Sequence, residues 1–508
     1  MGVTLLSLVV YLATLAPGLT FEHYGTDGGD LITAARTLGV PHPTGYPTYT
    51  LLAWLFSHLP VGIIAYRVNL LSAISAAGAV GLLCRTAQCL LPRDRYNLPL
   101  SVATALTFAF SLLLWSQAVI AEVYALLTFF AALFLWLMVR WRQGSGDWAL
   151  WLAALVVGLG LGNHLTLILA IPAALILIWD RLHQEWRRLI HPRTVLPALG
   201  FLFLGLAVYA YLPLAARHQP PVNWGNPQTW DQFKWVVTAE QYQRFAFGLG
   251  TEHVAGRLGD WSLLLGRQFG WWGLAIALVG GWSLWQRDRR FAVSSLTWML
   301  LVGFYAFLYD TGDSHVYLLP PLLLLAIWWG EGARYLLGLT VRMRAKWQNL
   351  ALTLVMLLPF LSLALNWEAS DLSEELSVHT YIQQALESVE PEGLVVVRGD
   401  GPTFALWYAI YAEEQRPDVA IVSGPLLAYI WYRGMVRHLY PDLALNEPRG
   451  AAVTTNDLVR DLITSNYGRR PIYATDPAEP WKDWFDFPQE GEGPMHRVLI
   501  KTRWETGD

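Results

Sequence analysis

The sequence predicts a mainly α-helical, polytopic membrane protein followed by a soluble α/β domain. Of its 508 residues, 54% are hydrophobic and only 15% are charged, whereas a soluble protein carries roughly a quarter charged residues. Apolar segments long enough to cross a bilayer, or nearly so, recur up to residue 366. Beyond it, amphipathic helical patterns alternate with short Val-rich strands. We therefore expect a transmembrane domain at 1–366 and an extracytoplasmic domain at 367–508.

Eleven apolar segments are expected to form the transmembrane domain. They lie near 2–20, 62–84, 98–116, 118–139, 147–162, 164–180, 194–214, 262–285, 291–309, 316–334 and 347–366. The first lacks a basic leader and a small-residue cleavage site, so it is interpreted as a retained helix. The break at Gly160-Leu-Gly-Asn-His164 leaves a second interpretation of 147–180, as a kinked, re-entrant pair.

The loops between these helices alternate in basic content. Five alternate loops carry Arg85, Arg93, Arg95, Arg140, Arg142, Arg181, Arg187, Arg188, Arg193, Arg287, Arg289, Arg290, Arg334, Arg342, Arg344 and Lys346. Because cytoplasmic loops are enriched in Lys and Arg, the N-terminus is predicted to be cytoplasmic. The C-terminal domain then lies outside the inner or plasma membrane.

The remaining connections hold the unusual polar residues. Two long outer-face loops, at 21–61 and 215–261, are expected to contain interfacial helices at 31–39 and 48–58 and an amphipathic, aromatic stretch at 227–250. Carboxylates, histidines, asparagines and tryptophans from five separate segments would meet at this membrane face. Such residues are costly near lipid, so their gathering predicts a functional site at the level of the headgroups.

Asp27, in Gly25-Thr-Asp-Gly-Gly-Asp30, is the leading catalytic candidate. A carboxylate at the interface is able to take a proton from an acceptor hydroxyl as that hydroxyl attacks an activated sugar. A helix cap on the interfacial helix that follows explains Asp27 about equally well. Asp30 shares a helical face with Asp27, where it tunes Asp27, binds substrate hydroxyls or is solvated.

Candidate substrate-binding residues in the first half of the chain each have a structural alternative. Arg36 is placed to pair with a lipid phosphate or with Asp30. His42, held between two prolines, contacts a phosphate or simply packs. Glu122, next to Val123 and Tyr124, is costly between two apolar spans unless it has a partner, which favours function. His164 beside Asn163 is similar, or caps a helix break.

Candidates in the second half lie on two outer loops. Arg217 is able to bind phosphate or to snorkel to the interface. Asn223-Trp-Gly-Asn-Pro227, with Trp224 and Asn226, predicts a rigid aromatic turn that stacks on a sugar, covers the site or anchors the loop. Asp310, Asp313 and His315 are dense enough to consider a metal, but a further ligand at fixed spacing is not evident, so no metal site is assigned.

Several function classes find no support in the sequence. A net charge of -4 gives no indication of nucleic-acid binding. The two cysteines, Cys84 and Cys89, do not form a disulfide framework or a metal pattern. No Walker loop, Rossmann fingerprint, HExxH motif or serine-nucleophile elbow is present, which argues against hydrolases and ATP-driven transporters.

The motif Asp27-Gly-Gly-Asp30 with Thr37-Leu-Gly-Val-Pro-His-Pro-Thr-Gly-Tyr-Pro47 resembles the signature of the domain-of-unknown-function 2723 family, which includes an animal transmembrane O-mannosyltransferase. The resemblance continues, in order, through Ala121-Glu-Val-Tyr124, Gly162-Asn-His-Leu165, Tyr211-Leu-Pro213, Asn223-Trp-Gly-Asn-Pro227, Asp310-Thr-Gly-Asp313, Trp407-Tyr408, Arg416-Pro-Asp-Val419 and Trp431-Tyr432. Tyr46 and Tyr124 join the candidate binding residues because they stand in these motifs.

This resemblance implies a glycosyltransferase of the GT-C fold. Such enzymes take a sugar, here mannose or another hexose, from a polyprenyl-phosphate donor at the outer face, usually with inversion. The donor is a substrate and no cofactor is implied. The base of the family maps to Asp27, whereas the family more often has Glu where this chain has Asp30. Cations at Arg36, Arg217 and His42 would stabilise the departing phosphate. The acceptor is a Ser or Thr hydroxyl of an exported protein, or a surface glycan or lipid.

Two other classes remain as alternatives. A lipid or solute transporter would place its ionisable residues at the bilayer midplane and show repeat symmetry, and the sequence shows neither. A non-catalytic membrane scaffold that presents the α/β domain would tolerate the loss of Asp27, whereas the enzyme would not.

Overall fold

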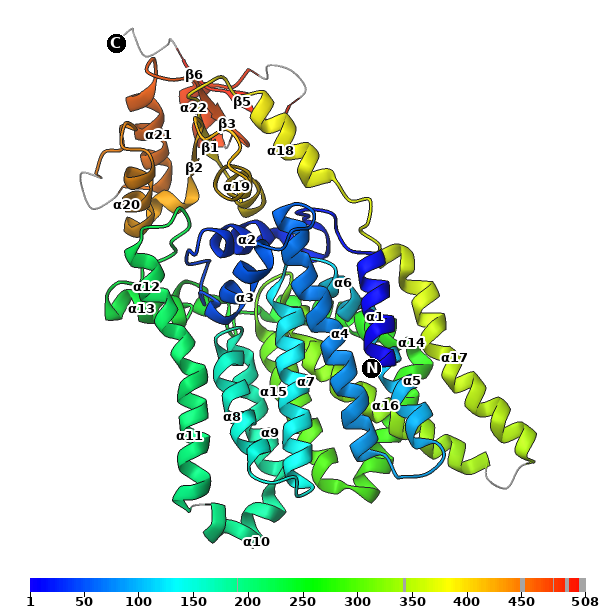
Figure 1. Ribbon diagram of the computed structural model, residues 1–508. Coiled ribbons are helices and arrows are strands. Elements are labelled where there is room, and N and C mark those ends of the chain that lie inside the picture. The colour runs from blue at the N-terminus through cyan, green and yellow to red at the C-terminus, as the bar shows by residue number, and fades with distance from the viewer. Residues whose placement is uncertain (190, 341–343, 448–452, 478, 489–492, 502–508) are drawn as a thin grey trace.

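The computed structural model describes residues 1–189, 191–340, 344–447, 453–477, 479–488 and 493–501. Figure 1 shows a bundle of long helices that carries a smaller α/β region at one end, above the short helices α2 (Gly28–Arg36) and α3 (Pro47–Ser57). This end is termed the α2 end, and the opposite end the basic end. Arg342, one of the residues of the predicted basic loops, lies outside the described residues.

The chain is an integral membrane protein. Seven helical segments among the described residues are long and apolar enough to cross a membrane, and two bent helix pairs raise the number to nine. The seven are α4 (Ile64–Leu90), α7 (Val123–Arg142), α11 with α12 (Pro192–Leu206 and Tyr211–Arg217), α14 (Val254–Arg287), α15 (Arg289–Leu308), α16 (Leu319–Leu339) and α17 (Ala345–Ser370). The expected segments at 2–20 and 147–162 form the shorter apolar helices α1 (Gly2–Ala13) and α8 (Trp148–Leu161).

Two of the expected segments contain or end at a sharp bend between two helices. The segment at 98–116 is divided into α5 (Asn97–Ala109) and α6 (Leu112–Ala118), bent by 66°. The segment at 164–180 ends with α9 (Ala170–Leu177), before a bend of 69° into α10 (Trp179–Leu189). At the bend after Ala109 both sides are apolar, so the hydrophobic pattern continues through it. The helix α10 beyond the second bend is polar, and the predicted segment ends at its start.

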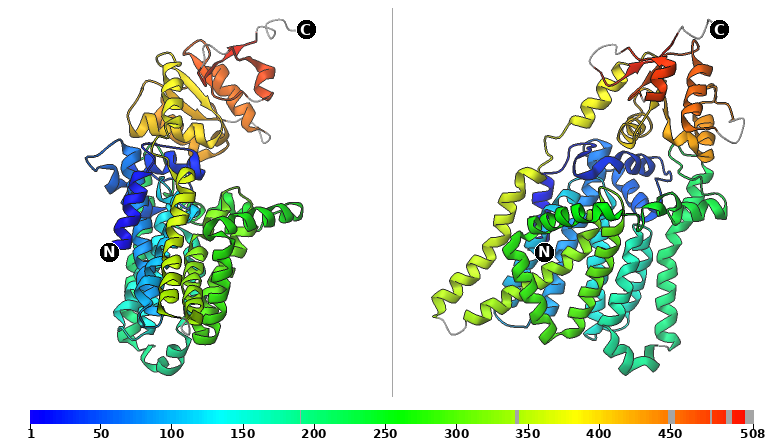
Figure 2. Two further views of the ribbon diagram at one scale, coloured as in Figure 1. Left: turned by 90° about the vertical axis from the view of Figure 1, so that its right-hand side faces the viewer. Right: turned by 180° about the vertical axis from the view of Figure 1, so that it is seen from behind.

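Helix α14 starts earlier than the predicted segment 262–285. Gly270, with a φ of 68°, divides it, and glycine adopts this conformation without steric cost. Its first part therefore belongs to the predicted outer loop 215–261, and Figure 2 shows this part lying across the bundle. The helix predicted at 118–139 starts later than expected. It begins at Val123, after a non-helical break.

The two loops that are predicted to face outward form one layer at the α2 end. The expected interfacial helices 31–39 and 48–58 are α2 and α3, and the stretch 227–250 contains α13 (Trp230–Val237) and the turn η4 (Glu240–Phe245). Backbone hydrogen bonds join the loops, because the Val40 N–H donates to the Val222 carbonyl at 2.9 Å and the Trp224 N–H to the Val40 carbonyl at 3.0 Å.

The C-terminal region is built on a mixed sheet. The buried strand β1 (Leu394–Val397) pairs in parallel with β2 (Ala420–Ser423) and β3 (Ile472–Ala474), and β5 (His496–Arg497) is antiparallel to β3. Around it lie α18 (Ser377–Glu387), α19 (Asp400–Trp407), α20 (Ile430–Leu439), α21 (Thr455–Asn466) and α22 (Glu479–Trp484), with the strand pair β4 (Phe485–Asp486) and β6 (Leu499–Ile500). The predicted βαβ order explains the parallel pairing.

Helix α19 packs directly on α2. A Cβ atom on Gly29 would lie 2.5 Å from the Phe404 carbonyl oxygen, so only glycine permits this approach. The contact brings Asp400, the first residue of α19, to the α2 end of the bundle. Figure 1 shows α19 directly above α2. The C-terminal region therefore contributes to the same layer as the outer loops.

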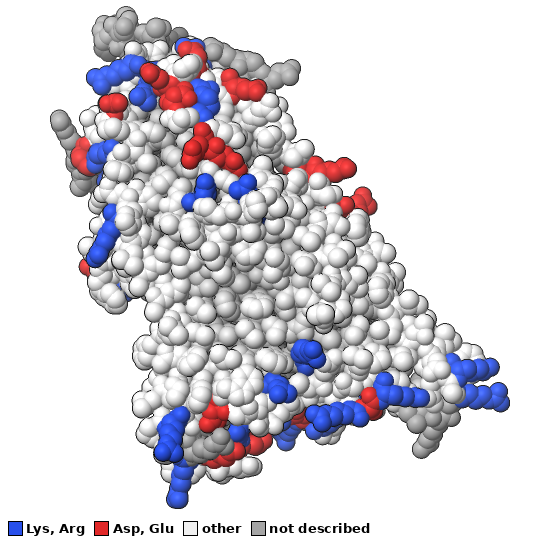
Figure 3. Space-filling view, viewed as in Figure 1, with Lys and Arg blue, Asp and Glu red and all other residues white. Residues whose placement is uncertain are grey.

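Charge is distributed unevenly along the molecule. Figure 3 shows Lys and Arg gathered at the basic end, and a broad belt almost without charged residues between this end and the α2 end. The belt is the surface that faces lipid in an integral membrane protein.

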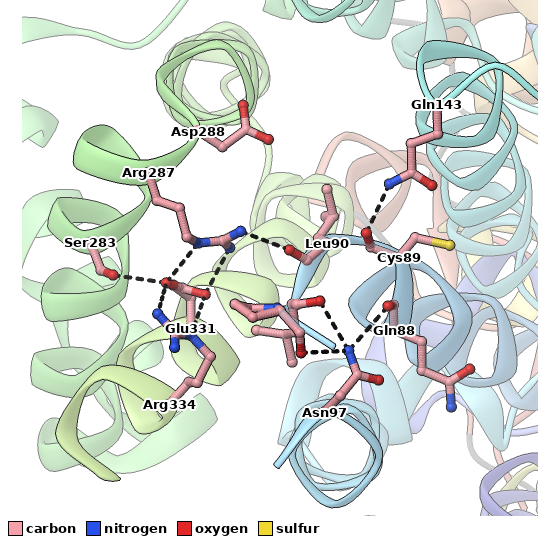
Figure 4. A network of polar contacts seen from close by, with 12 residues as sticks. Gln88, Cys89, Leu90, Asn97, Gln143, Ser283, Arg287, Asp288, Glu331 and Arg334 are labelled. Carbon is pink, nitrogen blue, oxygen red and sulfur yellow. Dashed lines mark hydrogen bonds and ion pairs between the residues drawn. The ribbon is translucent and has the colours of Figure 1, made fainter. Parts of the chain in front are cut away.

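A buried ion network lies toward the basic end. Glu331 on α16 is fully buried and accepts hydrogen bonds from Ser283 at 2.8 Å, from Arg287 at 2.9 and 3.2 Å and from Arg334 at 3.2 and 3.3 Å. Arg287 also donates to the Leu90 carbonyl at 3.0 Å. Figure 4 shows how these contacts join α4, α14 and α16.

We expect Glu331→Gln to lower the free energy of unfolding by about 3 kcal/mol, because it leaves two guanidinium groups without their carboxylate. The matched control is Asp180→Asn, which breaks the exposed Asp180–Arg290 pair and should cost less than about 1 kcal/mol. Thermal denaturation of both variants in detergent measures the difference. Equal midpoints would show that the buried network does not stabilise the bundle.

Candidate active site

A cavity of about 590 Å³ opens at the α2 end. It lies between the two outer loops, the breaks before α7 and after α8, the segment between α15 and α16, and the start of α19. Its polar and aromatic lining includes Asp27, His42, Tyr46, Tyr124, His164, Tyr242, Arg244, Asp313, Tyr317 and Asp400. Six of these were expected from the sequence, namely Asp27, His42, Tyr46, Tyr124, His164 and Asp313.

Asp27 presents its carboxylate to this cavity. It precedes the first residue of α2, but its side chain makes no capping hydrogen bond, and 41% of that side chain is exposed. The His42 Nε2 atom lies 3.5 Å from the Asp27 Oδ2 atom. Burial raises the pKa of Asp27 to about 6, although the charge on His42 opposes this rise. Of the two alternatives for Asp27, the helix cap is not formed by its side chain.

Asp30 lies behind His42 and does not reach the cavity. It is fully buried, and its Oδ2 atom accepts hydrogen bonds from the His42 backbone N–H at 2.9 Å and from His42 Nδ1 at 2.8 Å. Its Oδ1 atom accepts from Trp224 Nε1 at 2.9 Å. Asp30 therefore fixes the imidazole of His42 with Nε2 directed at Asp27.

The resulting series of groups, Asp30–His42–Asp27, couples a buried carboxylate to one that faces the cavity. Burial alone lowers the pKa of His42, but the carboxylates of Asp27 and Asp30 outweigh it and raise that pKa to about 9. At neutral pH the imidazole is therefore charged, and it stabilises the ionised form of Asp27.

One wall of the cavity is aromatic. The ring of His164 lies 6.5 Å from that of Tyr46, 5.7 Å from that of Tyr124 and 5.2 Å from that of Tyr317. The Tyr124 hydroxyl donates to Asp313 Oδ2 at 3.5 Å, and His164 Nδ1 is hydrogen-bonded to the Thr166 hydroxyl at 2.7 Å. These contacts hold flat, partly polar faces toward the space above Asp27, a surface suited to a sugar ring.

Two predicted site residues support the fold beneath the cavity. Trp224 is only 3% exposed, so it neither covers the site nor presents a face to a sugar; it holds Asp30 instead. Glu122 is 4% exposed and caps α7 by accepting a hydrogen bond from the Val123 N–H at 3.2 Å. Glu122 was expected to need a partner, and the partner that its carboxylate finds is the backbone of α7.

Five further predicted residues lie outside this cavity. Arg36 contacts His58 at 2.6 Å and not Asp30, Arg217 is exposed at the end of α12, and Asn226 accepts hydrogen bonds from Asn223 and Gln228. Asp310 lies 3.7 Å from Arg257, and His315 packs against Tyr24 with ring centroids 4.7 Å apart. Within the described residues, no group of three or more His, Cys, Asp or Glu is placed to hold a metal ion.

Four of these ten lining residues, namely Arg244, Tyr242, Tyr317 and Asp400, were not identified from the sequence. Arg244 and Tyr242 lie on η4, within a stretch noted only for its aromatic residues, and Arg244 is the one Lys or Arg among the described residues that line the cavity. Asp400 belongs to Gly399-Asp-Gly401, where the chain passes from β1 into α19. Its place at the carboxyl end of a parallel strand, where ligands of α/β sheets bind, was the available signal.

Comparisons with known proteins agree with this architecture. Residues 27–187 match the family model described as "Protein O-mannosyl-transferase TMEM260 N-terminal domain", and residues 378–467 match "TMEM260-associated domain 2". The chain is 30% identical to protein O-mannosyl-transferase TMEM260 of Mus musculus over 442 residues and 24% identical to its counterpart in Dictyostelium discoideum over 518 residues. These alignments cover 82% and 92% of this chain, which spans 62% of the length of each relative.

Solved structures show the fold. ArnT from Cupriavidus metallidurans bound to undecaprenyl phosphate aligns with a TM-score of 0.64 at 12% identity, over 99% of this chain and 98% of ArnT. Its apo state aligns with a TM-score of 0.61, also at 12% identity, over 97% and 96%. The chain is therefore a membrane protein that is similar in sequence to protein O-mannosyl-transferases and has the GT-C fold of ArnT.

Proposed function

We propose that this protein transfers mannose from a polyprenyl-phosphate donor to a Ser or Thr hydroxyl of an exported polypeptide. The observation that carries the proposal is the uncapped Asp27 carboxylate, supported by His42 and Asp30, inside a cavity of a GT-C fold. The protein O-mannosyl-transferases with similar sequences favour mannose and a protein acceptor over a surface glycan or lipid. The ArnT complex with undecaprenyl phosphate favours the lipid-linked donor.

The distribution of charge sets the proposed orientation. With the basic end in the cytoplasm, the cavity and the C-terminal region lie on the outer face, and the N-terminus is inside. The donor phosphate binds beside Arg244 on η4, and the polyprenyl chain runs into the bilayer between helices. Arg244 thus takes the role that the sequence assigned to Arg36 and Arg217, neither of which lines the cavity.

The proposed reaction is a single displacement. The acceptor oxygen attacks C1 of mannose as the bond from C1 to the phosphate oxygen breaks, and the electron pair leaves with the phosphate. Asp27 takes the hydroxyl proton, and Arg244 stabilises the charge that develops on the phosphate. Attack from the face opposite the phosphate inverts the anomeric centre. Polyprenyl phosphate and the mannosylated hydroxyl are the products.

The pKa values of the site predict a pH plateau for transfer. Below about pH 6 Asp27 is protonated and is unable to accept the hydroxyl proton, so the rate rises as pH passes through about 6. Above about pH 9 His42 loses the charge that balances Asp27 and the phosphate, so the rate falls. Initial rates from pH 5 to 10, with thermal midpoints at each pH as the control, test this. A profile flat from 5 to 7 would exclude Asp27 as the titrating base.

The direct test uses purified protein in detergent or nanodiscs with radiolabelled polyprenyl-phosphate mannose. The acceptor is a pool of acetylated, amidated decapeptides with one central Thr. We expect labelled peptide to form from this donor and not from GDP-mannose. Labelling from GDP-mannose alone would contradict the lipid donor, and loss of lipid-linked label without peptide labelling would contradict the peptide acceptor.

A further inference from the structure

A second cavity, of about 820 Å³, lies next to the candidate active site. One side is formed by the outer loop at residues 219–226 and by α13, and the other by residues 428–438, which include most of α20. Figure 1 shows α20 of the C-terminal region above the segment that contains α12 and α13. The cavity therefore forms only where the soluble region meets the outer loop.

The lining of this cavity does not suit an anionic lipid. The described residues that line it include no Lys or Arg but do include the carboxylates of Asp231 and Glu240. A phosphate would be repelled, whereas a neutral or weakly basic ligand would not. The cavity thus differs from the first one, where Arg244 offers a cation.

An aromatic cluster and two unpartnered polar atoms add a recognition surface. The rings of Trp235, Tyr429 and Trp431 lie 5.8 to 6.5 Å apart along the wall. Asn223 Oδ1 and Trp431 Nε1 are buried and have no hydrogen-bond partner among the described residues. They are one acceptor and one donor, the complement of the N–H and C=O of a peptide group.

The two cavities are close enough to share one ligand. Thr238 and Ala239 line the first cavity, and the next residue, Glu240, lines the second. The ring of Trp224 lies 6.2 Å from that of His42 and 5.2 Å from that of Trp431. Trp431 is thus within about 12 Å of His42, a distance that about four extended residues span.

We infer that the second cavity binds an extended segment of the acceptor polypeptide and so presents a neighbouring Ser or Thr to Asp27. This inference rests on the proposed function, and it names the determinant of acceptor choice. Room for the segment is provided on α20, where a Cβ atom on Gly434 would meet nothing within 4 Å. Ile430 at the start of the same helix is 79% exposed and lines the cavity.

Photocrosslinking without any donor tests this inference separately from sugar transfer. Ile430→p-benzoylphenylalanine is illuminated with the radiolabelled decapeptide pool, and the matched control is Leu376→p-benzoylphenylalanine, an exposed apolar position that precedes α18. We expect at least ten-fold more labelled protein from the Ile430 variant. Addition of Gly434→Phe, which places a ring in the cavity, should reduce its labelling to that of the control while the thermal midpoint is retained.

Three results would overturn the inference. They are equal labelling at positions 430 and 376, labelling that survives Gly434→Phe, and labelling that a mannooligosaccharide suppresses but excess unlabelled peptide does not. The last result would assign the cavity to a glycan. Specific labelling by a protein that transfers no mannose would support the peptide site and contradict the proposed function, so the two failures are distinguishable.

Discussion

Asp27→Asn is expected to reduce mannose transfer roughly 1,000-fold, because the amide is unable to accept the hydroxyl proton in the transition state. The side chain makes no capping hydrogen bond and is 41% exposed to the cavity, so α2 does not depend on it. Expression and thermal midpoint should therefore remain close to those of the wild type. Initial rates with radiolabelled polyprenyl-phosphate mannose measure the effect.

The matched control for this variant is Asp310→Asn. Asp310 lies on a neighbouring loop, 44% of its side chain is exposed, and it lies outside the cavity beside Arg257. We expect its transfer rate to stay within about two-fold of the wild type, because Asp310 does not line the cavity. If Asp27→Asn retains full transfer activity, Asp27 is not the base and its role is purely structural.

Asp30→Asn is expected to slow transfer about 100-fold and to change its pH profile. The variant lacks the carboxylate that accepts hydrogen bonds from the backbone N–H and Nδ1 of His42. The imidazole of His42 would therefore lose its orientation and the negative charge beside it. Because the Asp30 carboxylate contributes to the raised pKa of His42, the fall in rate should begin well below pH 9 in the variant. Initial rates from pH 6 to 10 detect this change.

If Asp30 has a purely structural role, Asp30→Asn would lower the transfer rate without shifting the pH at which that rate falls on the alkaline side. The conservative variant Asp30→Glu keeps the charge, and it carries the residue more often found at this position in the resembling family. We expect it to retain the alkaline limb near pH 9 even if its rate is reduced. Identical profiles for the Asn and Glu variants would show that Asp30 acts by packing alone.

Much of the fold could be predicted, because long apolar segments indicate membrane-spanning helices and basic residues mark the loops between them. Each of the eleven expected segments contains a helix, and the βαβ pattern gives the parallel pairing of β1 with β2 and β3. The bend after Ala109 and the break at Gly270 were not predictable, because apolar residues continue on both sides of them.

The candidate site was only partly predictable, since sequence motifs do not state which side chains face a common space. Asp27, His42 and His164 stand in motifs and line one cavity. Trp224 looks like a sugar platform in sequence, but its indole N–H serves the buried Asp30. Arg244 was missed because a single cation in an aromatic stretch is indistinguishable from a surface arginine before the chain is folded.

The most direct test of the account is a cryo-electron microscopy structure of the protein with undecaprenyl phosphate. The account predicts density for the phosphate in the 590 Å³ cavity, next to Arg244 and near Asp27, with the lipid chain passing between helices toward the bilayer. Phosphate density in the cavity lined by Trp431, or at the basic end, would contradict the assignment of Asp27 and Arg244 to the active site.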